Sequence, residues 1–297
     1  MKKWIPIAAL IFCCMIWGTT FVVVKDVSTK IDPYLLSIIR NLIAVIVILP
    51  IILITKKWDS LKNTKAIKYG FITGLFLGAI YVIQTIGIRF TSSNHSAFIT
   101  CSSVIIVPIM LILIGRQRIT KQQIFSIVLI SIGMFYLTKV KSNENYNVGD
   151  IITFIGAFFC AAHIILSGHF VRKTDFLGLI FYQFFFACII SIIGLVINTK
   201  ITGNEIIFKE TAINDVLYLG FLGSLFCFFI TVWAQKHVST MYTAMIFSLE
   251  PIFATTTSYF YSGELFTQTE IVGAIGIFTG LIFYSIPLKK TIIKSHF

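Results

Sequence analysis

MYTAMIFSLEPIFATTTSYFYSGE, residues 241–264, is an apolar segment of helical length with Glu250 and Pro251 near its middle. A carboxylate at that depth in a bilayer costs roughly 2.5 to 3.5 kcal/mol on insertion scales. Pro251 also removes a backbone donor and clashes one turn back along the helix. Because lipid supplies no hydrogen-bonding partner, we expect other parts of the chain to face Glu250.

The composition places the whole chain in a membrane. Of its 297 residues 57% are hydrophobic and only 12% are charged, and its mean hydropathy is +0.92. Soluble domains carry about 25% charged residues. The net charge of +12 does not indicate nucleic-acid binding, because Lys and Arg stand in short clusters between apolar runs. The six cysteines lie inside apolar runs without metal-type or redox-type spacing, so we expect neither a metal site nor a disulfide framework.

Apolar runs long enough to cross a bilayer recur along the chain, separated by short polar loops. They lie at 4–24, 34–54, 66–88, 96–114, 122–138, 151–171, 176–197, 213–235, 241–262 and 269–287. The expected fold is therefore an all-α polytopic membrane protein with ten transmembrane helices.

The basic residues predict the orientation. With both termini on the cytoplasmic side, sixteen of the 24 Lys and Arg residues face the cytoplasm, seven face outward and Arg40 lies inside a helix. Positive charge is enriched in cytoplasmic loops. We therefore expect a multi-pass protein of the cell inner (cytoplasmic) membrane, with an even number of spans.

The two halves of the chain show weak internal similarity. Asp32 precedes a helix with Arg40 eight positions on, and Asp175 precedes a helix with Gln183 eight positions on, an offset of 143. Two further matches, of Thr120 with Thr267 and of Gly133 with Gly280, have an offset of 147. Five helices per half give the second copy the opposite orientation, so the fold is predicted as two inverted five-helix repeats. The expected boundaries are 1–139 and 151–288 for the repeats, 140–150 for the linker and 289–297 for a cytoplasmic tail.

Several motifs in chain order carry a resemblance to a known family. They are Trp17-Gly18 with Phe21 and Lys25; Pro33 with Arg40; Gly87, Arg89 and Thr91 before Ser96 to Thr100 and Val107-Pro108; Gly149-Asp150; Leu249-Glu250-Pro251, Gly263-Glu264, Gly273 and Gly280. Over nearly the whole chain this pattern resembles the ten-helix EamA-type transporters of the drug/metabolite transporter superfamily. The resemblance implies alternating access, with helices one to four and six to nine around a central cavity and helices five and ten outside it.

The first repeat departs from the family pattern. Arg116 stands where many members have Glu. In the second repeat Pro251 lies thirteen positions before Glu264, whereas Ser103 occupies the same position relative to Arg116. The resemblance therefore implies two asymmetric halves rather than a functional twofold.

Three ionisable residues are candidates for chemistry inside the membrane. Glu250 could bind a cationic or amino group of a substrate, take up a proton during coupling, or hold a structural hydrogen bond. Arg40 could bind a carboxylate or phosphate, pair internally, for instance with Glu250, or be a structural arginine near the interface. His163 has no second ligand at metal spacing, so it is either a core histidine or a proton-linked group of the cavity wall.

Uncharged polar and aromatic residues extend the candidate substrate site. They are Gln84, Ser102, Ser103, Tyr182 and Gln183 for hydrogen bonding, and Trp17, Tyr81, Trp233 and Tyr242 for aromatic surface. Individually each is more often a packing residue, but together they suit an amphipathic organic solute.

The leading functional prediction is a secondary transporter, with export of an amino acid or amino-acid-like compound by alternating access. Uptake or exchange of a nucleoside-type metabolite is the alternative within transport, and a non-transporting membrane receptor or scaffold is the alternative of another class. The chain lacks HExxH, nucleophile-elbow and phosphate-loop motifs, so we expect neither an enzyme nor a cofactor. The expected partners are a small-molecule substrate and the lipid bilayer, with a homodimer as an option.

Overall fold

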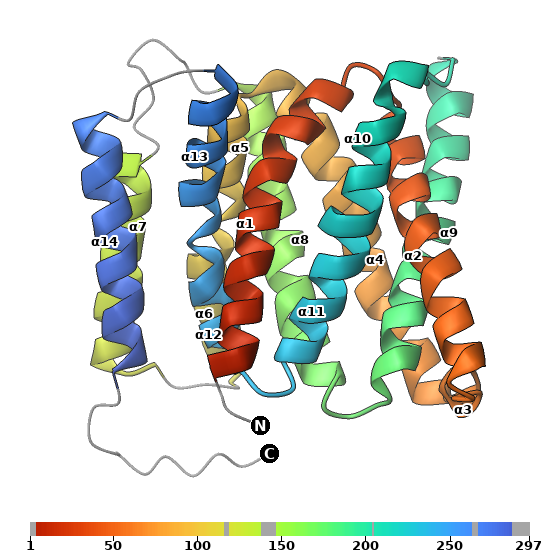
Figure 1. Ribbon diagram of the computed structural model, residues 1–297, viewed down its shortest axis with the longest axis horizontal. Helices are drawn as coiled ribbons and strands as arrows, with labels where there is room; N and C mark the ends of the chain where they lie inside the picture. Colours follow the sequence, from red (N-terminus) through yellow and green to blue (C-terminus); the bar gives the residue numbers. More distant parts are fainter. Residues whose placement is uncertain (1–3, 116–118, 138–146, 204, 263–266, 287–297) are drawn as a thin grey trace.

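The computed structural model describes residues 4–115, 119–137, 147–203, 205–262 and 267–286, which form a bundle of helices (Figure 1). The first half contains α1 (Trp4–Val27), α2 (Pro33–Ile54), α3 (Asp59–Lys62), α4 (Thr64–Phe90), α5 (Ser93–Thr100), α6 (Ser103–Leu113) and α7 (Lys121–Leu137). The second contains α8 (Val148–Phe170), α9 (Phe176–Thr202), η1 (Glu210–Ala212), α10 (Ile213–Tyr218), the π-helical η2 (Leu219–Phe226), α11 (Cys227–Ala234), α12 (Thr240–Phe247), α13 (Glu250–Ser262) and α14 (Gln268–Ser285).

The predicted all-helical membrane fold is confirmed. Within the residues listed above, eight helical segments are long and apolar enough to cross a membrane. The predicted fifth span, α7, is apolar but shorter, and the predicted ninth span is divided into α12 and α13. The number ten is therefore reached only by counting these two. Gly263-Glu264, Arg116 and the predicted boundaries at 139 and 288 lie outside the described residues.

The prediction of one continuous helix over 241–262 is wrong. Helix α12 ends at Phe247, and Glu250 begins α13 after a short turn. Pro251 has no N–H to donate to the carbonyl of Phe247 four residues earlier, but a proline is well tolerated in the first turn of a new helix. The Sγ of Cys101 lies 3.5 Å from the Phe247 carbonyl oxygen and donates to it instead.

The fourth span is also divided, where the sequence predicted continuity over 96–114. Helix α5 ends at Thr100 and α6 begins at Ser103. The side chains over 100–103 are Thr, Cys, Ser and Ser, all of modest helix propensity. The predicted span 213–235 is helical throughout but widens into the π-helical η2 between α10 and α11.

The two halves repeat the same pattern of helices. Helices α5, α6 and α7 begin at Ser93, Ser103 and Lys121, and α12, α13 and α14 begin at Thr240, Glu250 and Gln268, a constant offset of 147. Helices α2 and α9 follow the N-caps Asp32 and Asp175, an offset of 143. The offsets noticed in the sequence are thus offsets between helix starts.

The second copy runs in the opposite direction through the bundle. In Figure 1 α1 begins at the lower end of the molecule, where α14 finishes, and ends at the upper end, where α8 begins. The contacts agree, because Lys25 in the last turn of α1 binds the backbone of Thr91, and the Thr91 hydroxyl binds Asp150 in the first turn of α8. The end of the bundle that holds Lys25 and Asp150 is called the upper end below, and the opposite end the lower end.

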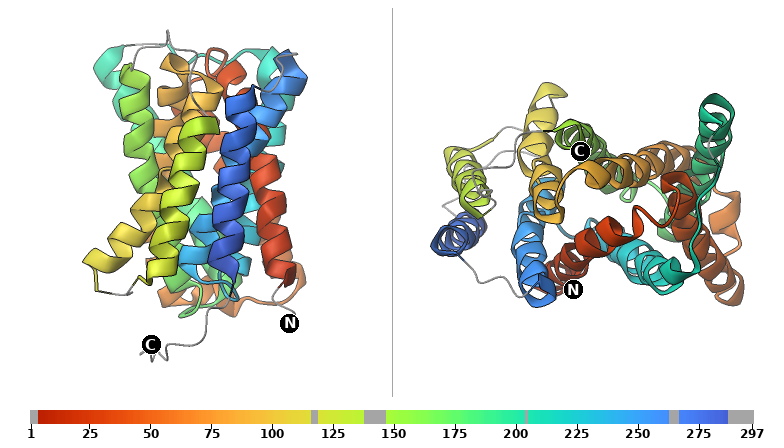
Figure 2. Two further views of the ribbon diagram at one scale, coloured as in Figure 1. Left: turned by 90° about the vertical axis from the view of Figure 1, so that its left-hand side faces the viewer. Right: turned by 90° about the horizontal axis from the view of Figure 1, so that it is seen from above.

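Helices α7 and α14 form a pair beside the remainder of the bundle (Figure 2). Glycines bring their backbones together, and a Cβ added to Gly273 would lie 2.2 Å from the backbone nitrogen of Leu137. Helix α4 packs equally closely on α9, because a Cβ on Gly70 would lie 2.3 Å from the Cβ of Tyr182. Small residues permit such approaches between membrane helices.

Candidate functional site: a cavity inside the bundle

A small cavity of about 60 Å³ lies inside the helix bundle. Its lining comes from α1, α2, α4, α5, α8, α11, α12 and α13, and consists of Trp17, Thr20, Phe21, Arg40, Ile80, Tyr81, Gln84, Thr100, Cys160, His163, Ile164, Phe228, Thr231, Phe247 and Glu250. Pockets that hold organic ligands usually measure about 300–1,000 Å³. The cavity is therefore smaller than the pockets that usually hold organic solutes.

Arg40 occupies one corner of this cavity and is 3% exposed. Its Nε donates to the Oγ of Ser224 at 2.9 Å, and its Cζ lies 3.9 Å from the centroid of the Tyr81 ring. Ser224 belongs to η2, and its hydroxyl donates to the carbonyl of Leu219 five residues earlier. The Nη1 of Arg40 finds no hydrogen-bond partner within the described part of the chain. This permanently charged group can therefore still donate to an anionic group in the cavity.

Glu250 occupies a second corner, at the start of α13, and is 7% exposed. The Sγ of Cys101, in the break between α5 and α6, lies 3.8 Å from its Oε2. The two divided helices thus meet at the carboxylate. No ion pair joins Glu250 to Arg40 among the described residues, so the internal pairing considered for Arg40 is not formed.

One aromatic ring of the lining, that of Phe228, contacts three other lining residues. The centroid of Phe228 lies 5.2 Å from that of Trp17, 5.9 Å from that of Tyr81 and 5.3 Å from that of His163, each in edge-to-face geometry. The Nε1 of Trp17 donates to the carbonyl of Gly223 in η2 at 2.8 Å. Edge-to-face contacts add to the packing energy of buried rings, so Phe228 links the walls from α1, α4 and α8.

Six of the twelve predicted site residues line the cavity: Trp17, Arg40, Tyr81, Gln84, His163 and Glu250. Two others lie at the lower end of the bundle. The hydroxyl of Tyr182 donates to the carbonyl of Leu61 at 2.6 Å. The hydroxyl of Tyr242 lies 2.6 Å from the Ser285 Oγ, and its ring stacks on Tyr284 of the peripheral α14.

The remaining four predicted residues do not line the cavity. Ser102 and Ser103 stand at the break between α5 and α6. Gln183 is fully buried in α9, next to the imidazole of His163. Trp233 packs on His237 with centroids 5.8 Å apart and is not part of the lining.

Several lining residues could not be predicted from the sequence. Phe228 and Phe247 are two of 29 phenylalanines, and no spacing distinguishes them from those that face lipid. Thr20 and Thr231 are hydroxyl residues in otherwise apolar helices, and Thr19 beside Thr20 does not line the cavity. Their common cavity depends on the packing of helices far apart in the chain.

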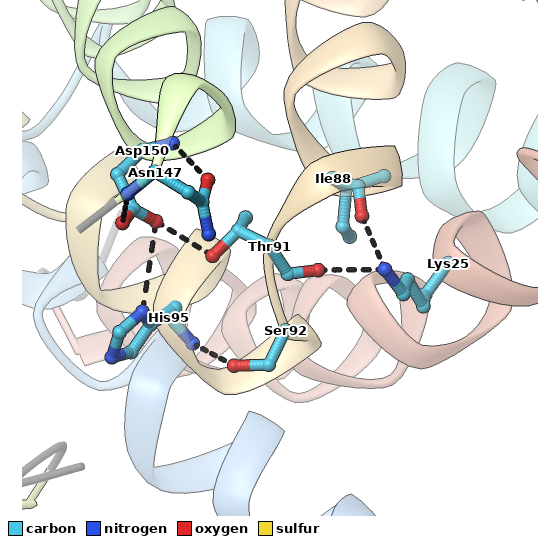
Figure 3. A network of polar contacts seen from close by, with 7 residues as sticks. All are labelled: Lys25, Ile88, Thr91, Ser92, His95, Asn147 and Asp150. Atoms are coloured by element: carbon cyan, nitrogen blue, oxygen red, sulfur yellow. Dashed lines mark hydrogen bonds and ion pairs between the residues drawn. The ribbon is translucent and has the colours of Figure 1, made fainter. Parts of the chain in front are cut away.

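A polar network closes the upper end of the bundle between the two halves (Figure 3). The Oδ1 of Asp150 accepts from the hydroxyl of Thr91 at 2.6 Å and lies 3.6 Å from the Nδ1 of His95. Asn147 and Asp150 form a capping box at the start of α8. The Nζ of Lys25 donates to the carbonyl of Thr91 at 2.7 Å. This network ties α1, α5 and α8 together above the cavity.

A second hollow, of about 530 Å³, lies at the upper ends of α2, α4 and α9. Asp32, Arg89, Asn198 and Glu205 contribute its polar groups. Although it is larger, none of the predicted site residues lines it. Among the residues that the structure describes, no group of three or more His, Cys, Asp or Glu side chains is arranged to hold a metal ion.

Inverted halves whose divided helices meet at a buried carboxylate are the architecture of a membrane transporter. The chain belongs to the EamA-like transporter family, whose model matches residues 4–139 and 147–286. The family predicted from the motifs is thereby confirmed. Because the protein belongs to this family, it is a membrane transporter.

Relatives agree with this assignment. The chain is 30% identical over 279 residues to an uncharacterized transporter of Archaeoglobus fulgidus, covering 93% of this chain and 84% of the relative. It is 22% identical to the uncharacterized transporter YyaM of Bacillus subtilis, covering 89% and 88%. The crystal structure of a protein with 12% identity has the same fold, with a TM-score of 0.72 over 93% of this chain and 95% of the other.

Proposed function

We propose that the protein is a secondary transporter that exports a small metabolite bearing both a carboxylate and an amino group, such as an amino acid. One observation carries this proposal: the guanidinium of Arg40 and the carboxyl group of Glu250 line the same cavity, are both buried, and form no ion pair with each other within the described residues. A buried charge is costly unless it is paired. A zwitterion with its carboxylate at Arg40 and its ammonium at Glu250 satisfies both charges at once.

The mechanism we propose is alternating access. The two repeats, 1–139 and 151–288, rock about the cavity and expose it to one side of the membrane at a time. The small volume of the cavity supports this mechanism, because a solute can enter only when helices separate. The upper end faces the cell exterior in this proposal, and both termini lie in the cytoplasm.

Counterflow in proteoliposomes tests the substrate class. Vesicles loaded with an unlabelled mixture of amino acids should accumulate labelled amino acid from outside. Arg40→Gln and Glu250→Gln should each lower the rate at least tenfold, while Lys200→Gln, an exposed charge on α9, should leave it unchanged. Saturable binding without flux would instead favour a receptor. Counterflow of nucleosides alone would favour the alternative suggested by the aromatic lining around Phe228.

Glu250 is also our proposed proton-coupling residue. If protonation of Glu250 releases the ammonium group, transport by the wild type depends on pH and transport by Glu250→Gln does not. The rate in vesicles with imposed pH gradients measures this. A pH profile unchanged by the substitution would exclude Glu250 from coupling.

Labelling tests the orientation. Cysteines introduced at Lys57 and Lys200 stand at opposite ends of the bundle. A membrane-impermeant maleimide added to intact cells should label the residue at 200 and not the residue at 57. The reverse pattern would overturn the proposed topology.

A further inference from the structure

Three buried polar side chains of the second half form a third corner of the cavity. His163 in α8, Gln183 in α9 and Thr231 in α11 are each at most 2% exposed. His163 and Thr231 line the cavity, and Gln183 lies beside the His163 ring. The Gln183 amide faces the His163 imidazole, yet the Nε2 of His163, both amide atoms of Gln183 and the Oγ1 of Thr231 form no hydrogen bond of normal geometry in the described part of the chain.

Such groups are not explained by packing. A buried polar atom without a partner costs stability, and folded proteins leave few of them. Single atoms of this kind also occur in Asn41, Ser96, Ser126 and Thr153, whereas here three residues from three helices leave four of them at the cavity or beside it. The buried hydroxyl of Thr73, by contrast, is satisfied within its own helix, where its Oγ1 donates to the carbonyl of Tyr69 at 2.9 Å. The gathering of unsatisfied atoms at the cavity indicates a ligand that supplies the missing hydrogen bonds.

The chemistry of this corner differs from that of the other two. Arg40 and Glu250 are the charged residues in the described lining, whereas the third corner offers amide, imidazole and hydroxyl groups. Gln183 stands in the second half at the position that Arg40 occupies in the first, by the same offset of 143 that relates Asp175 to Asp32. The repeat thus places a cation at one corner and a neutral amide, both donor and acceptor, at the corresponding one.

We propose that His163, Gln183 and Thr231 form a neutral subsite that hydrogen-bonds the side chain of the solute, which is an α-amino acid with an uncharged amide or hydroxyl side chain. This inference rests on the proposed function, because Arg40 and Glu250 take the carboxylate and the ammonium group. Phe228 separates the corners, since its ring contacts both Tyr81 next to Arg40 and His163. Three different corners around one ring also select one enantiomer.

Binding to the purified full-length protein, measured by calorimetry in lipid nanodiscs, tests the subsite. L-threonine and L-valine have nearly the same shape and differ by a hydroxyl, as do L-asparagine and L-leucine by an amide. A site with buried groups that require a hydrogen bond rejects the apolar analogue strongly. We expect the polar member of at least one pair to bind tenfold or more tightly than the apolar member, and the L form more tightly than the D form.

Variants locate the selectivity. Thr231→Val and Gln183→Met should reduce the polar-to-apolar affinity ratio at least fivefold while the affinity for L-alanine, which does not reach the subsite, changes less than twofold. Thr73→Val is the matched control and should leave the ratio unchanged, because its hydroxyl is satisfied inside α4. Thermal unfolding of each variant establishes that it is folded, and the wild-type ratios stand as a test even if a variant is not.

The two proposals fail in different ways. If no α-amino acid binds to the wild type, the proposed function is overturned. If amino acids bind through Arg40 and Glu250 but valine and leucine bind as well as threonine and asparagine, the neutral subsite alone is overturned. An unchanged ratio in folded Thr231→Val and Gln183→Met has the same consequence.

Discussion

Lys25 and Arg172 hold equivalent carbonyl oxygens at opposite ends of the bundle. The Nζ of Lys25 donates to the carbonyls of Ile88 at 2.8 Å and Thr91 at 2.7 Å. The guanidinium of Arg172 donates to the carbonyls of Gln235 and Val238, both at 2.9 Å. The offset of 147 between the repeats relates Lys25 to Arg172, and it also relates the carbonyls of residues 88 and 91 to those of residues 235 and 238. Each cation satisfies the free carbonyls at a helix C-terminus and ties two helices of one repeat together.

The contacts of Lys25 and of Arg172 with these carbonyls should each limit access to the cavity from one end of the bundle. We expect Lys25→Met to increase access from the upper end and Arg172→Met to increase access from the lower end, because each loosens one end only. The rate at which Cys160, a lining residue, reacts with an impermeant maleimide added to either side of oriented vesicles measures access. The other five cysteines are replaced beforehand.

Lys25→Met and Arg172→Met should each also lower the free energy of unfolding by about 1.5 kcal/mol. This value is near the low end of the range for hydrogen bonds from a charged donor, because both side chains are partly exposed. Equal labelling of Cys160 from both sides in both variants would show that the contacts of Lys25 and Arg172 do not control access to the cavity.

Asp150 should contribute more to stability than an ordinary helix cap. It closes the capping box of α8 and also contacts Thr91 and His95 of the first half. We expect Asp150→Ala to lower the free energy of unfolding by about 1–3 kcal/mol, since it removes the acceptor of the buried Thr91 hydroxyl. Glu270→Ala is the matched control, because Glu270 closes the capping box of α14 at a position that is less buried than that of Asp150.

Denaturant unfolding in detergent measures both variants. Equal losses would mean that Asp150 acts only as a cap and that its contacts with the first half contribute little.

Helices α7 and α14 should be needed for stability but not for binding. Gly273→Ala places a Cβ 2.2 Å from backbone of α7, which forces the pair apart and should cost about 1–3 kcal/mol. Gly276→Ala is the milder control, because its Cβ meets its nearest neighbour, the Gly133 Cα, at 3.1 Å. Solute affinity should stay within twofold in both, because neither helix lines the cavity. Lost affinity in a folded Gly273→Ala protein would contradict this separation.

The break before Glu250 should be required for transport. Pro251→Ala restores a backbone donor that can bond to the carbonyl of Phe247, so α12 and α13 can join and turn the carboxylate away from Cys101. We expect transport to fall at least tenfold with little change in the thermal unfolding temperature. Pro50→Ala, inside the continuous and exposed end of α2, is the control and should transport normally. A Pro251→Ala protein with full activity would show that the break is not needed.

The spans could be predicted closely because hydrophobic length is a local property. The predicted run 34–54 is α2 at 33–54, and 122–138 is α7 at 121–137. The offsets of 143 and 147 were visible because N-caps such as Asp32 and Asp175 are chosen by local hydrogen bonding. The breaks at 101–102 and 248–249 were not predicted, since each is stabilised by contacts with a helix distant in the sequence, such as the bond from the Cys101 Sγ to the Phe247 carbonyl.

The sequence by itself determined that this protein is a helical membrane transporter with an inverted repeat, because continuous apolar runs, helix caps and repeated spacings are all local in the chain. Only the tertiary structure decided which side chains share the cavity. It brought Arg40 and Glu250, from opposite halves of the chain, to the same lining, packed Phe228 against Tyr81 and His163, and left Tyr182 and Tyr242 outside. The reason is physical: the candidate spans are apolar along most of their length, so the face of each that turns inward is chosen by packing against other helices rather than by its own pattern.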